Sequence, residues 1–175
     1  MDRGLGGLRV AVIGAGEAGR WFARLCLQHG VAVTLEDVLP AKLRRAMDEL
    51  SGLGDLALAS SIEDAVREAD IAIDFVPDEL ESKLEIFSLL DRMAPPRTSL
   101  LTPTEVLSIA DLASCTYRRT RCFGVRGLRR GDATVQLVHP SGTDPDALGG
   151  VTGLLEGLGL QCNVGVDGIE SALAR

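Results

Sequence analysis

Three glycines near the start of the chain have the spacing of a loop that binds phosphate groups. Gly14, Gly16 and Gly19 form a G-x-G-x-x-G pattern after the apolar run 10–13 and before a helical pattern. The first permits a tight turn, the second lets a pyrophosphate approach the backbone, and the third lets the helix pack against the strand. The helix dipole adds to the attraction for phosphate. This context favours a dinucleotide site over an ordinary glycine-rich turn, with the loop residues Gly14, Ala15, Gly16, Glu17, Ala18 and Gly19.

An acidic residue follows the second apolar run where a ribose-binding carboxylate is expected. Asp37 stands about 20 residues after the glycine pattern, as in dinucleotide-binding folds. A carboxylate there accepts hydrogen bonds from the ribose hydroxyls and repels a 2′-phosphate, so Asp37 predicts NAD rather than NADP. Glu36 is the competing acid, but as the last strand residue it should face the other way. Arg44 and Arg45 weaken the preference for NAD, because either could reach a phosphate.

Basic side chains gather in one stretch of an otherwise acidic chain. The 175 residues carry a net charge of −7, which argues against nucleic-acid binding, since that needs a basic face. The local cluster is either a solvated loop or a site for an anionic ligand. It consists of Arg118, Arg119, Arg121, Arg126, Arg129 and Arg130.

The four cysteines show no C-x-x-C spacing, and no metal site is expected. Cys26 falls in the first predicted helix and Cys122 in an apolar run, so both should be reduced core residues. The N-terminus lacks an apolar signal segment, and no stretch approaches the roughly 18 apolar residues of a membrane span. These features predict a cytoplasmic protein without membrane contact.

Apolar runs that alternate with helical patterns predict the scaffold for these residues. We expect residues 1–175 to form one Rossmann-type domain of the α/β class, with a doubly wound, mostly parallel sheet and helices on both faces. Residues 121–125 and 133–139 are expected to add an antiparallel pair. The predicted strands are 10–13, 31–35, 56–59, 71–76, 99–101, 121–125, 133–139 and 160–166. The predicted helices follow Gly16 and cover 40–50, about 60–69, 77–93 and 145–158, with a further helix beginning within 169–175.

Successive sequence blocks resemble the NAD-binding domain of the 3-hydroxyacyl-CoA dehydrogenase family over nearly the whole chain. The blocks are V-A-V-I-G-A-G-E-A-G-R, V-T-L-E-D-V-L-P, A-D-I-A-I-D-F-V-P-D-E-L-E-S-K and L-S-I-A-D-L-A. The resemblance implies NAD as the cofactor and places Val76, Pro77, Asp78 and Lys83 at the cofactor, the last two near the nicotinamide ribose. An acid at a helix start and a solvated lysine are the alternative interpretations of Asp78 and Lys83.

The positions that match the family's catalytic residues carry other side chains. Glu105 replaces the substrate-binding serine, Arg126 replaces the histidine, and Val138 or His139 falls where the glutamate that orients the histidine should be. The family's last catalytic asparagine lies in a C-terminal helical domain, which we expect to be absent. Histidine suits proton transfer because its pKa lies near neutrality, whereas arginine stays protonated. Arg126, His139 and Glu105 are therefore weak catalytic candidates.

Three functions follow as hypotheses. The first is a degenerate member that binds NAD(H), with little or no dehydrogenase activity. The second is an active oxidoreductase in which Arg126 holds an anionic substrate such as an acyl-CoA or another hydroxy- or oxo-compound. The third is a structural protein with a vestigial pocket. If Glu105 and Arg126 face each other, their pairing would close the substrate site.

The family's helical domain usually carries the dimer contact, so we expect a homodimer or hetero-complex through Leu148–Leu158 and Ile169–Ala174.

Overall fold

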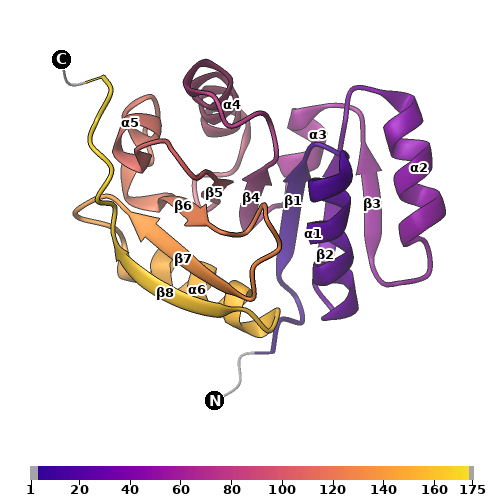
Figure 1. Ribbon diagram of the computed structural model, residues 1–175. Helices are drawn as coiled ribbons and strands as arrows, with labels where there is room; N and C mark the ends of the chain where they lie inside the picture. Colours follow the sequence, from indigo (N-terminus) through magenta and orange to yellow (C-terminus); the bar gives the residue numbers. More distant parts are fainter. Residues whose placement is uncertain (1–3, 174–175) are drawn as a thin grey trace.

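Parallel strands connected by helices make up most of the molecule (Figure 1). The computed structural model describes residues 4–173, in which eight strands form one sheet in the order β3-β2-β1-β4-β5-β6-β7-β8. The predicted Rossmann-type α/β fold is confirmed. The elements are β1 (Arg9–Ile13), α1 (Glu17–Gln28), β2 (Ala32–Glu36), α2 (Pro40–Leu50), β3 (Leu56–Ala59), α3 (Ile62–Val66), β4 (Ile71–Asp74), α4 (Leu80–Met93), β5 (Ser99–Pro103), α5 (Ile109–Ser114), η1 (Arg119–Arg121), β6 (Cys122–Arg126), β7 (Thr134–His139), α6 (Pro145–Gly157) and β8 (Gln161–Val166).

The order of the strands reverses between β1 and β4. From β1 the chain moves outward to β2 and β3 and then returns to β4 on the other side of β1. In open α/β sheets a ligand crevice forms at such a reversal, beyond the carboxyl ends of the strands. The residues that follow β1, β2 and β4 therefore border one crevice, and these are the segments that begin with Gly14, Asp37 and Phe75.

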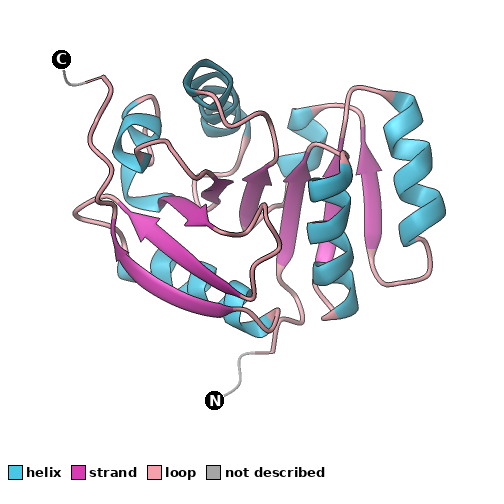
Figure 2. Ribbon diagram, in the orientation of Figure 1, coloured by secondary structure: helices cyan, strands magenta, loops and turns pink. Residues whose placement is uncertain are grey.

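Apolar residues on both faces of the sheet form two cores, which explains why helices cover both faces (Figure 2). Phe22 of α1 and Val151 of α6 are buried on one face, where α2 also packs. Phe87 of α4 and Leu112 of α5 are buried on the other face, together with α3. The crevice is therefore built on strands that are held from two sides.

The antiparallel addition predicted for the second half is confirmed. Gly124 of β6 lies opposite Val138 of β7, and the two strands run in opposite directions. β8 then pairs with β7 in parallel. The predicted start of α6 is also confirmed, because the Asp144 side chain accepts a hydrogen bond from the Asp146 amide.

Two predicted helix boundaries are wrong. α4 begins at Leu80 rather than Pro77, because residues 77–79 form a turn in which the Glu79 amide donates to the Pro77 carbonyl at 2.8 Å. α3 ends at Val66 rather than Ala69, because the Ala69 amide closes a tighter turn onto the Val66 carbonyl at 3.1 Å. The residues after β4 thus enter the crevice as a loop.

The helix predicted within 169–175 is also wrong as far as Leu173, and residues 174–175 lie outside the described residues. The segment instead lies along α5. Asp111 of α5 accepts hydrogen bonds from the Ser171 hydroxyl and, at 2.7 Å, from the Ala172 amide. α5 is itself missing from the predicted elements, and its start is capped by the Ser108 side chain, which accepts a hydrogen bond from the Asp111 amide.

The apolar side of α6 is used within the chain, which corrects part of the expected partner surface. The buried residues Val151, Leu154 and Leu155 belong to the core, and Leu148 packs against it. The residues of α6 that face outward include Gly149, Gly150, Gly153 and Glu156. Residues 148–158 therefore offer little apolar surface to a partner.

Candidate functional site

The glycine-rich loop has the geometry that a dinucleotide requires. Gly14 follows β1 with a φ of +104°, which favours glycine. A Cβ on Gly19 would stand 1.8 Å from the Gly14 carbonyl oxygen, so α1 packs directly on the turn. A Cβ on Gly16 would meet nothing within 4 Å, and this open space at the N-terminus of α1 is where a phosphate approaches the backbone. The loop residues therefore fit NAD.

Asp37 lies beside this loop at the end of β2. One carboxylate oxygen accepts a hydrogen bond from the Ala15 amide at 2.9 Å, and the other accepts from the Leu39 amide at 2.9 Å. The Lys42 ammonium stands 3.9 Å from the same carboxylate. An ionised carboxylate has about four acceptor sites, so capacity for ribose hydroxyls remains. The strand end thus supplies the acid that the sequence predicts.

The neighbouring acid, Glu36, is in a different environment. It pairs in register with Ile13 of β1 and Ala59 of β3, both in the core that α3 and α4 cover. Glu36 is 4% exposed, and burial together with the Asp37 charge raises the pKa of its carboxyl to about 7. Asp37, bonded to the glycine-rich loop, is therefore the better placed of the two acids for a ribose.

Lys83 is part of a buried ion pair. Its ammonium lies 2.8 Å from Asp74 at the end of β4, and both side chains are fully buried. The second carboxylate oxygen of Asp74 has no hydrogen-bond partner among residues 4–173. The solvated alternative for Lys83 is thus wrong. Contact between Lys83 and the nicotinamide ribose stays a prediction.

Asp78 connects the loop after β4 to the loop after β5. Its carboxylate accepts hydrogen bonds from the Thr104 hydroxyl at 2.5 Å and from the Glu105 amide at 2.8 Å. Val76 and Pro77 precede it in the same loop. Asp78 therefore positions residues 104 and 105, and its contact with the nicotinamide ribose stays a prediction.

Arg126 is fully engaged within the chain. Its guanidinium donates to the carbonyl oxygens of Thr104 and Leu107, at 2.6 and 3.2 Å, and pairs with Asp167 at 2.8 Å. The Arg126 and Asp167 side chains are only 13% and 4% exposed. Asp167 also accepts from the Ile109 amide at the start of α5. The cation at the family's histidine position thus holds the segment after β8 against the loop after β5.

Glu105 faces Arg130 rather than Arg126. One Glu105 carboxylate oxygen accepts from the Gly127 amide at 2.7 Å, and the other lies 3.3 Å from the Arg130 guanidinium. The pairing of Glu105 with Arg126 that the sequence left open does not form, because Arg126 pairs with Asp167. The ion pair between Glu105 and Arg130 nevertheless joins the loop after β5 to the β6–β7 turn.

His139 lies away from Arg126. Arg126 pairs in register with Gln136, so His139 stands three residues further along β7, about 10 Å away at the usual strand rise. The His139 Nδ1 atom is 2.8 Å from the Pro140 carbonyl oxygen. Val138 is the other residue that could match the family's glutamate. It lies opposite Gly124 and is buried. Neither residue supplies a proton-transfer group beside Arg126.

The predicted arginine cluster is not one anion site. Its members come from η1, β6 and the β6–β7 turn, and most of them pair with different acids. Four arginines of the cluster form five ion pairs: Arg118 with Asp91, Arg121 with Asp144, Arg126 with Asp167, and Arg130 with Asp132 and with Glu105. Arg119 and Arg129 have no acidic partner among residues 4–173, and Arg129 donates instead to the Val76 carbonyl oxygen.

Residues 4–173 contain neither a metal-binding cluster of side chains nor a membrane-spanning helix. No group of three or more His, Cys, Asp or Glu side chains could hold a metal ion in this range. Over the same range, no helix has both the length and the apolar character needed to cross a membrane. The predicted burial of Cys26 and Cys122 is confirmed, and all four cysteines are free thiols.

Curated relatives of the chain are dehydrogenases. It is 29% identical over 136 residues to a probable 3-hydroxybutyryl-CoA dehydrogenase of Bacillus subtilis, covering 67% of this chain and 47% of the relative. It is 31% identical over 124 residues to the 3-hydroxyadipyl-CoA dehydrogenase of Escherichia coli, covering 60% of this chain and 26% of that relative. The chain thus spans about half the length of the first relative and less of the second.

Solved structures and a family model agree with this relationship. A 3-hydroxyacyl-CoA dehydrogenase of Archaeoglobus fulgidus superposes with a TM-score of 0.80 at 26% identity, covering 95% of this chain and 58% of that chain. A diketoreductase structure gives a TM-score of 0.82 at 24% identity over 96% of this chain and 68% of that chain, which shows the shared fold. Residues 9–55 and 51–162 match the model for the 3-hydroxyacyl-CoA dehydrogenase NAD-binding domain, and the chain belongs to this NAD-binding family.

Proposed function

We propose that this chain is an NAD(H)-binding module that has lost the 3-hydroxyacyl-CoA dehydrogenase reaction. The observation that carries the proposal is the arrangement at Arg126. At the position of the family's histidine, an arginine is bonded to Asp167 and to the carbonyl oxygens of Thr104 and Leu107. The nucleotide-binding part of the crevice keeps its three glycines and Asp37. The chain should therefore bind NAD(H) although it lacks the residues that catalyse the reaction.

The chemistry explains why this replacement matters. Oxidation of a 3-hydroxyl needs a base that removes the hydroxyl proton while hydride leaves for the nicotinamide, which bound NAD supplies. An arginine keeps its proton at any ordinary pH, so it cannot act as this base. Val138 provides no carboxylate to orient a base. The residues that remain can bind a cofactor but cannot accept the proton at this position.

The carboxylate of Glu105 also works against an acyl substrate. It stands where the family has a hydroxyl that donates to the substrate, and it already accepts from the Gly127 amide. A negative group there would repel the enolate-like oxygen of a 3-oxoacyl compound. The active alternative, in which Arg126 holds an anionic hydroxy- or oxo-substrate, would require Arg126 to release Asp167 and two carbonyl oxygens. The geometry therefore supports the degenerate module.

Cofactor binding and catalysis can be measured separately. We expect calorimetric titration to detect NADH binding, and we expect no NADH consumption with acetoacetyl-CoA or formation with 3-hydroxybutyryl-CoA. General acid–base catalysis contributes about 10²–10⁴-fold, so loss of the base alone suppresses the reaction. Turnover near one per second, the low end of ordinary enzyme rates, would refute the proposal. If slow turnover appears, a gain in Arg126→His would show that only the base is missing. A loss in His139→Ala would show that His139 acts as the base.

We also propose a cytoplasmic location and an assembly with a second subunit, either another copy or a different chain. Burial raises the pKa of the Cys26 and Cys122 thiols, which keeps them in the neutral form suited to a reducing compartment. The assembly is supported by exposed apolar side chains near the last strand, among them Val164 and Val166. An acyl-CoA or another anionic small molecule is the further ligand that we propose, and the resemblance to a probable 3-hydroxybutyryl-CoA dehydrogenase supports it.

A further inference from the structure

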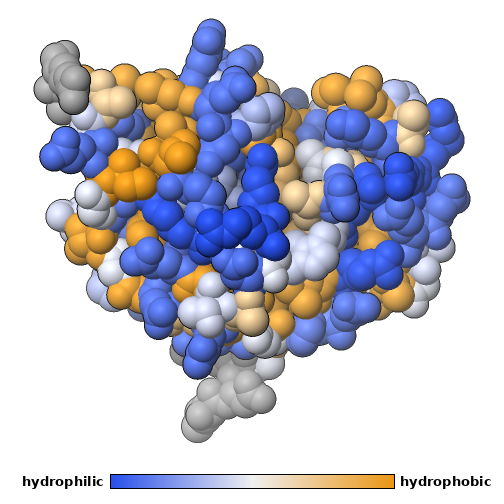
Figure 3. Space-filling model, in the orientation of Figure 1, coloured by the Kyte–Doolittle hydropathy of each residue, from blue (hydrophilic) through white to orange (hydrophobic). Residues whose placement is uncertain are grey.

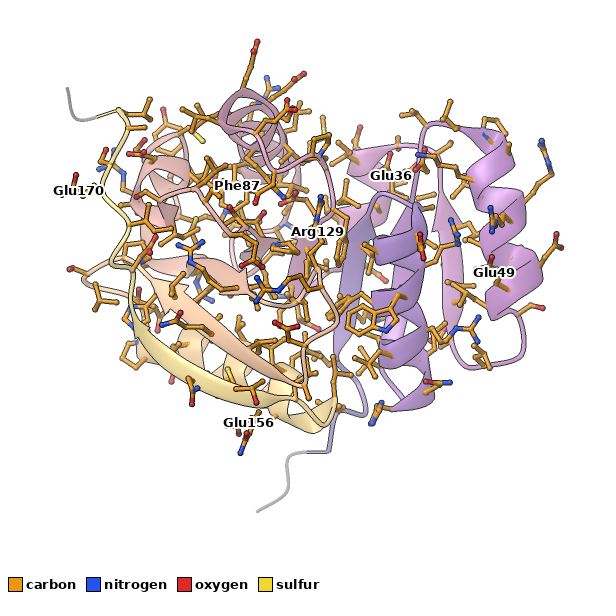
Figure 4. All side chains as sticks on the ribbon, viewed as in Figure 1. Glu36, Glu49, Phe87, Arg129, Glu156 and Glu170 are labelled. Atoms are coloured by element: carbon orange, nitrogen blue, oxygen red, sulfur yellow. The ribbon has the colours of Figure 1, made fainter. Side chains whose placement is uncertain are left out.

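Arg129 stands at the crevice without an acidic partner. It belongs to the turn between β6 and β7, and Figure 4 shows it extending from this turn toward the loop that follows β4. Its Nη2 atom donates to the Val76 carbonyl oxygen at 2.7 Å. This hydrogen bond links the turn to the loop that carries Val76, Pro77 and Asp78. The guanidinium is therefore fixed beside residues assigned to the cofactor.

The rest of the Arg129 guanidinium is not satisfied by the chain. Its Nε atom is buried and has no hydrogen-bond partner among residues 4–173. A buried donor without a partner costs about 1–3 kcal/mol, and such groups in folded proteins call for an explanation. A ligand that accepts a hydrogen bond at this point would remove the cost. Because the donor is cationic, an anionic acceptor fits best.

A hollow at this place joins Arg129 to the start of α1. It has a volume of about 440 Å³ and is lined by Glu17, Ala18, Trp21, Arg129, Arg130 and Gly131. The first turn of α1, which presents its free amides and positive dipole end, therefore forms one wall and the arginines of the β6–β7 turn form the opposite wall. Figure 3 shows strongly hydrophilic side chains over this turn in the middle of the face. Glu17 is the single acid among the lining residues.

We propose that Arg129 is a cofactor-binding residue whose guanidinium contacts the diphosphate bridge of NAD from the side opposite the glycine-rich loop. Two positive elements, the α1 N-terminus and Arg129, then face the two negative phosphates. The Val76 carbonyl holds the arginine in place, and the unsatisfied Nε donor receives a phosphate oxygen. Glu17 lowers the positive potential of the hollow without pairing with Arg129.

This role distinguishes Arg129 from its neighbour. Arg130 has a side chain that is 62% exposed and is paired with Asp132 and Glu105. Arg130 also lines the hollow, but its donors are occupied by these carboxylates. The matched control is therefore Arg119, an exposed arginine of η1 that does not line the hollow. The inference rests on the NAD binding of the family and not on the loss of dehydrogenase activity, so its failure would leave the proposed function untouched.

The test is a calorimetric titration of the full chain with NAD, ADP and adenosine. ADP carries the diphosphate without the nicotinamide half, and adenosine carries neither. We expect Arg129→Gln to weaken NAD and ADP about 10- to 100-fold, the usual range for one hydrogen bond to a charged group, with adenosine unchanged. Arg119→Gln should change all three affinities less than twofold. The decrease in ADP affinity with added salt should also become shallower in Arg129→Gln.

Three results would overturn the assignment. Unchanged NAD and ADP affinities would show that no contact forms. An equal loss for adenosine would show that Arg129 acts only by supporting the Val76 loop. Tighter NAD binding in Arg129→Gln would show that the arginine occludes the crevice. A measurement on the unaltered chain complements the variants: ADP, but not adenosine, should slow phenylglyoxal modification of Arg129, with modification of Arg119 unaffected. Equal modification rates would contradict the proposal independently of any folding defect.

Discussion

At the residue scale, two glycines of the same loop have separable roles. Gly16 has open space at its Cβ position and a φ of −70°, which any residue adopts. Gly16→Ala should therefore keep its melting temperature but lose at least tenfold in NADH affinity, because the methyl group occupies the phosphate approach. Gly19→Ala places its methyl group 1.8 Å from the Gly14 carbonyl oxygen and should lower stability by about 2 kcal/mol or more.

Thermal melting and calorimetric titration of both variants check this pair. Each variant is the control for the other, because Gly16→Ala should lower the affinity for NADH and Gly19→Ala should lower the stability. A Gly16→Ala protein that binds NADH normally would mean that the cofactor does not approach this part of the loop. A Gly19→Ala protein of full stability would mean that α1 can shift away from the turn without loss.

Glu36 gives the chain a pH-dependent contribution to stability. Its carboxyl has a pKa of about 7 in the folded chain and 4.5 as the ordinary value, so the folded state keeps a proton that the unfolded state has lost. Stability from this group is complete below about pH 4.5 and is lost as the pH rises to about 7. Glu36→Gln should match the unaltered chain near pH 4 and exceed it by about 1–3 kcal/mol at pH 8.

Urea unfolding at the two pH values measures this difference. Glu63→Gln on the exposed side of α3 is the control and should show no pH-dependent gain. If the Glu36→Gln advantage were the same at both pH values, the effect would come from packing rather than from ionisation.

At the element scale, the ion pair between Arg126 and Asp167 holds the segment after β8 onto β6 and the loop after β5. Removing one partner of a buried ion pair leaves the charge of the other partner uncompensated. Asp167→Asn should therefore lower the free energy of unfolding by about 1–3 kcal/mol, since the amide oxygen keeps one acceptor. It should also expose residues 167–173 to limited proteolysis.

Glu170→Gln is the matched control, because this exposed residue lies in the same segment (Figure 4). Its protease sensitivity and its unfolding midpoint should equal those of the unaltered chain. Equal stability of Asp167→Asn and Glu170→Gln would show that the ion pair contributes nothing measurable to the folded state.

The elements that could be predicted from sequence are those whose cause is local. The bounds 40–50 of α2 and 56–59 of β3 match the structure, because apolar periodicity and a leading proline act within a few residues. The start of α4 could not be predicted in this way. Pro77 is compatible with a helix start, and only the contacts of Asp78 with the loop after β5 keep residues 77–79 in a turn.

The same distinction applies to the candidate site. The glycine-rich loop and Asp37 follow a fixed spacing, so the sequence indicates them directly. The partner of Arg126 lies 41 residues away and the partner of Glu105 lies 25 residues away, across turns whose direction no local pattern determines. The orphaned donor of Arg129 is likewise visible only when the loops after β4 and β6 are placed together.

At the scale of the whole molecule, we expect the last strand to provide the surface for a second subunit. β8 pairs only with β7 among the described strands, so it is a sheet edge with unpaired backbone groups. Val164 and Val166 are 44% and 61% exposed there, and Leu173 follows at 49%. We expect sedimentation to show a mass above that of one chain, with Val166→Lys shifting it toward the monomer. A monodisperse monomer at high concentration would contradict this expectation.

The tie between Asp167 and Arg126 has a further consequence for how the chain opens. An edge strand normally frays first, because fewer contacts hold it than hold the centre of a sheet. Here the residue directly after β8 is bonded to β6 and to the start of α5, so β8 cannot detach unless those two contacts break as well. The outer part of the sheet should therefore open as one cooperative unit, with amides of β7 and β8 exchanging their hydrogens at a common rate.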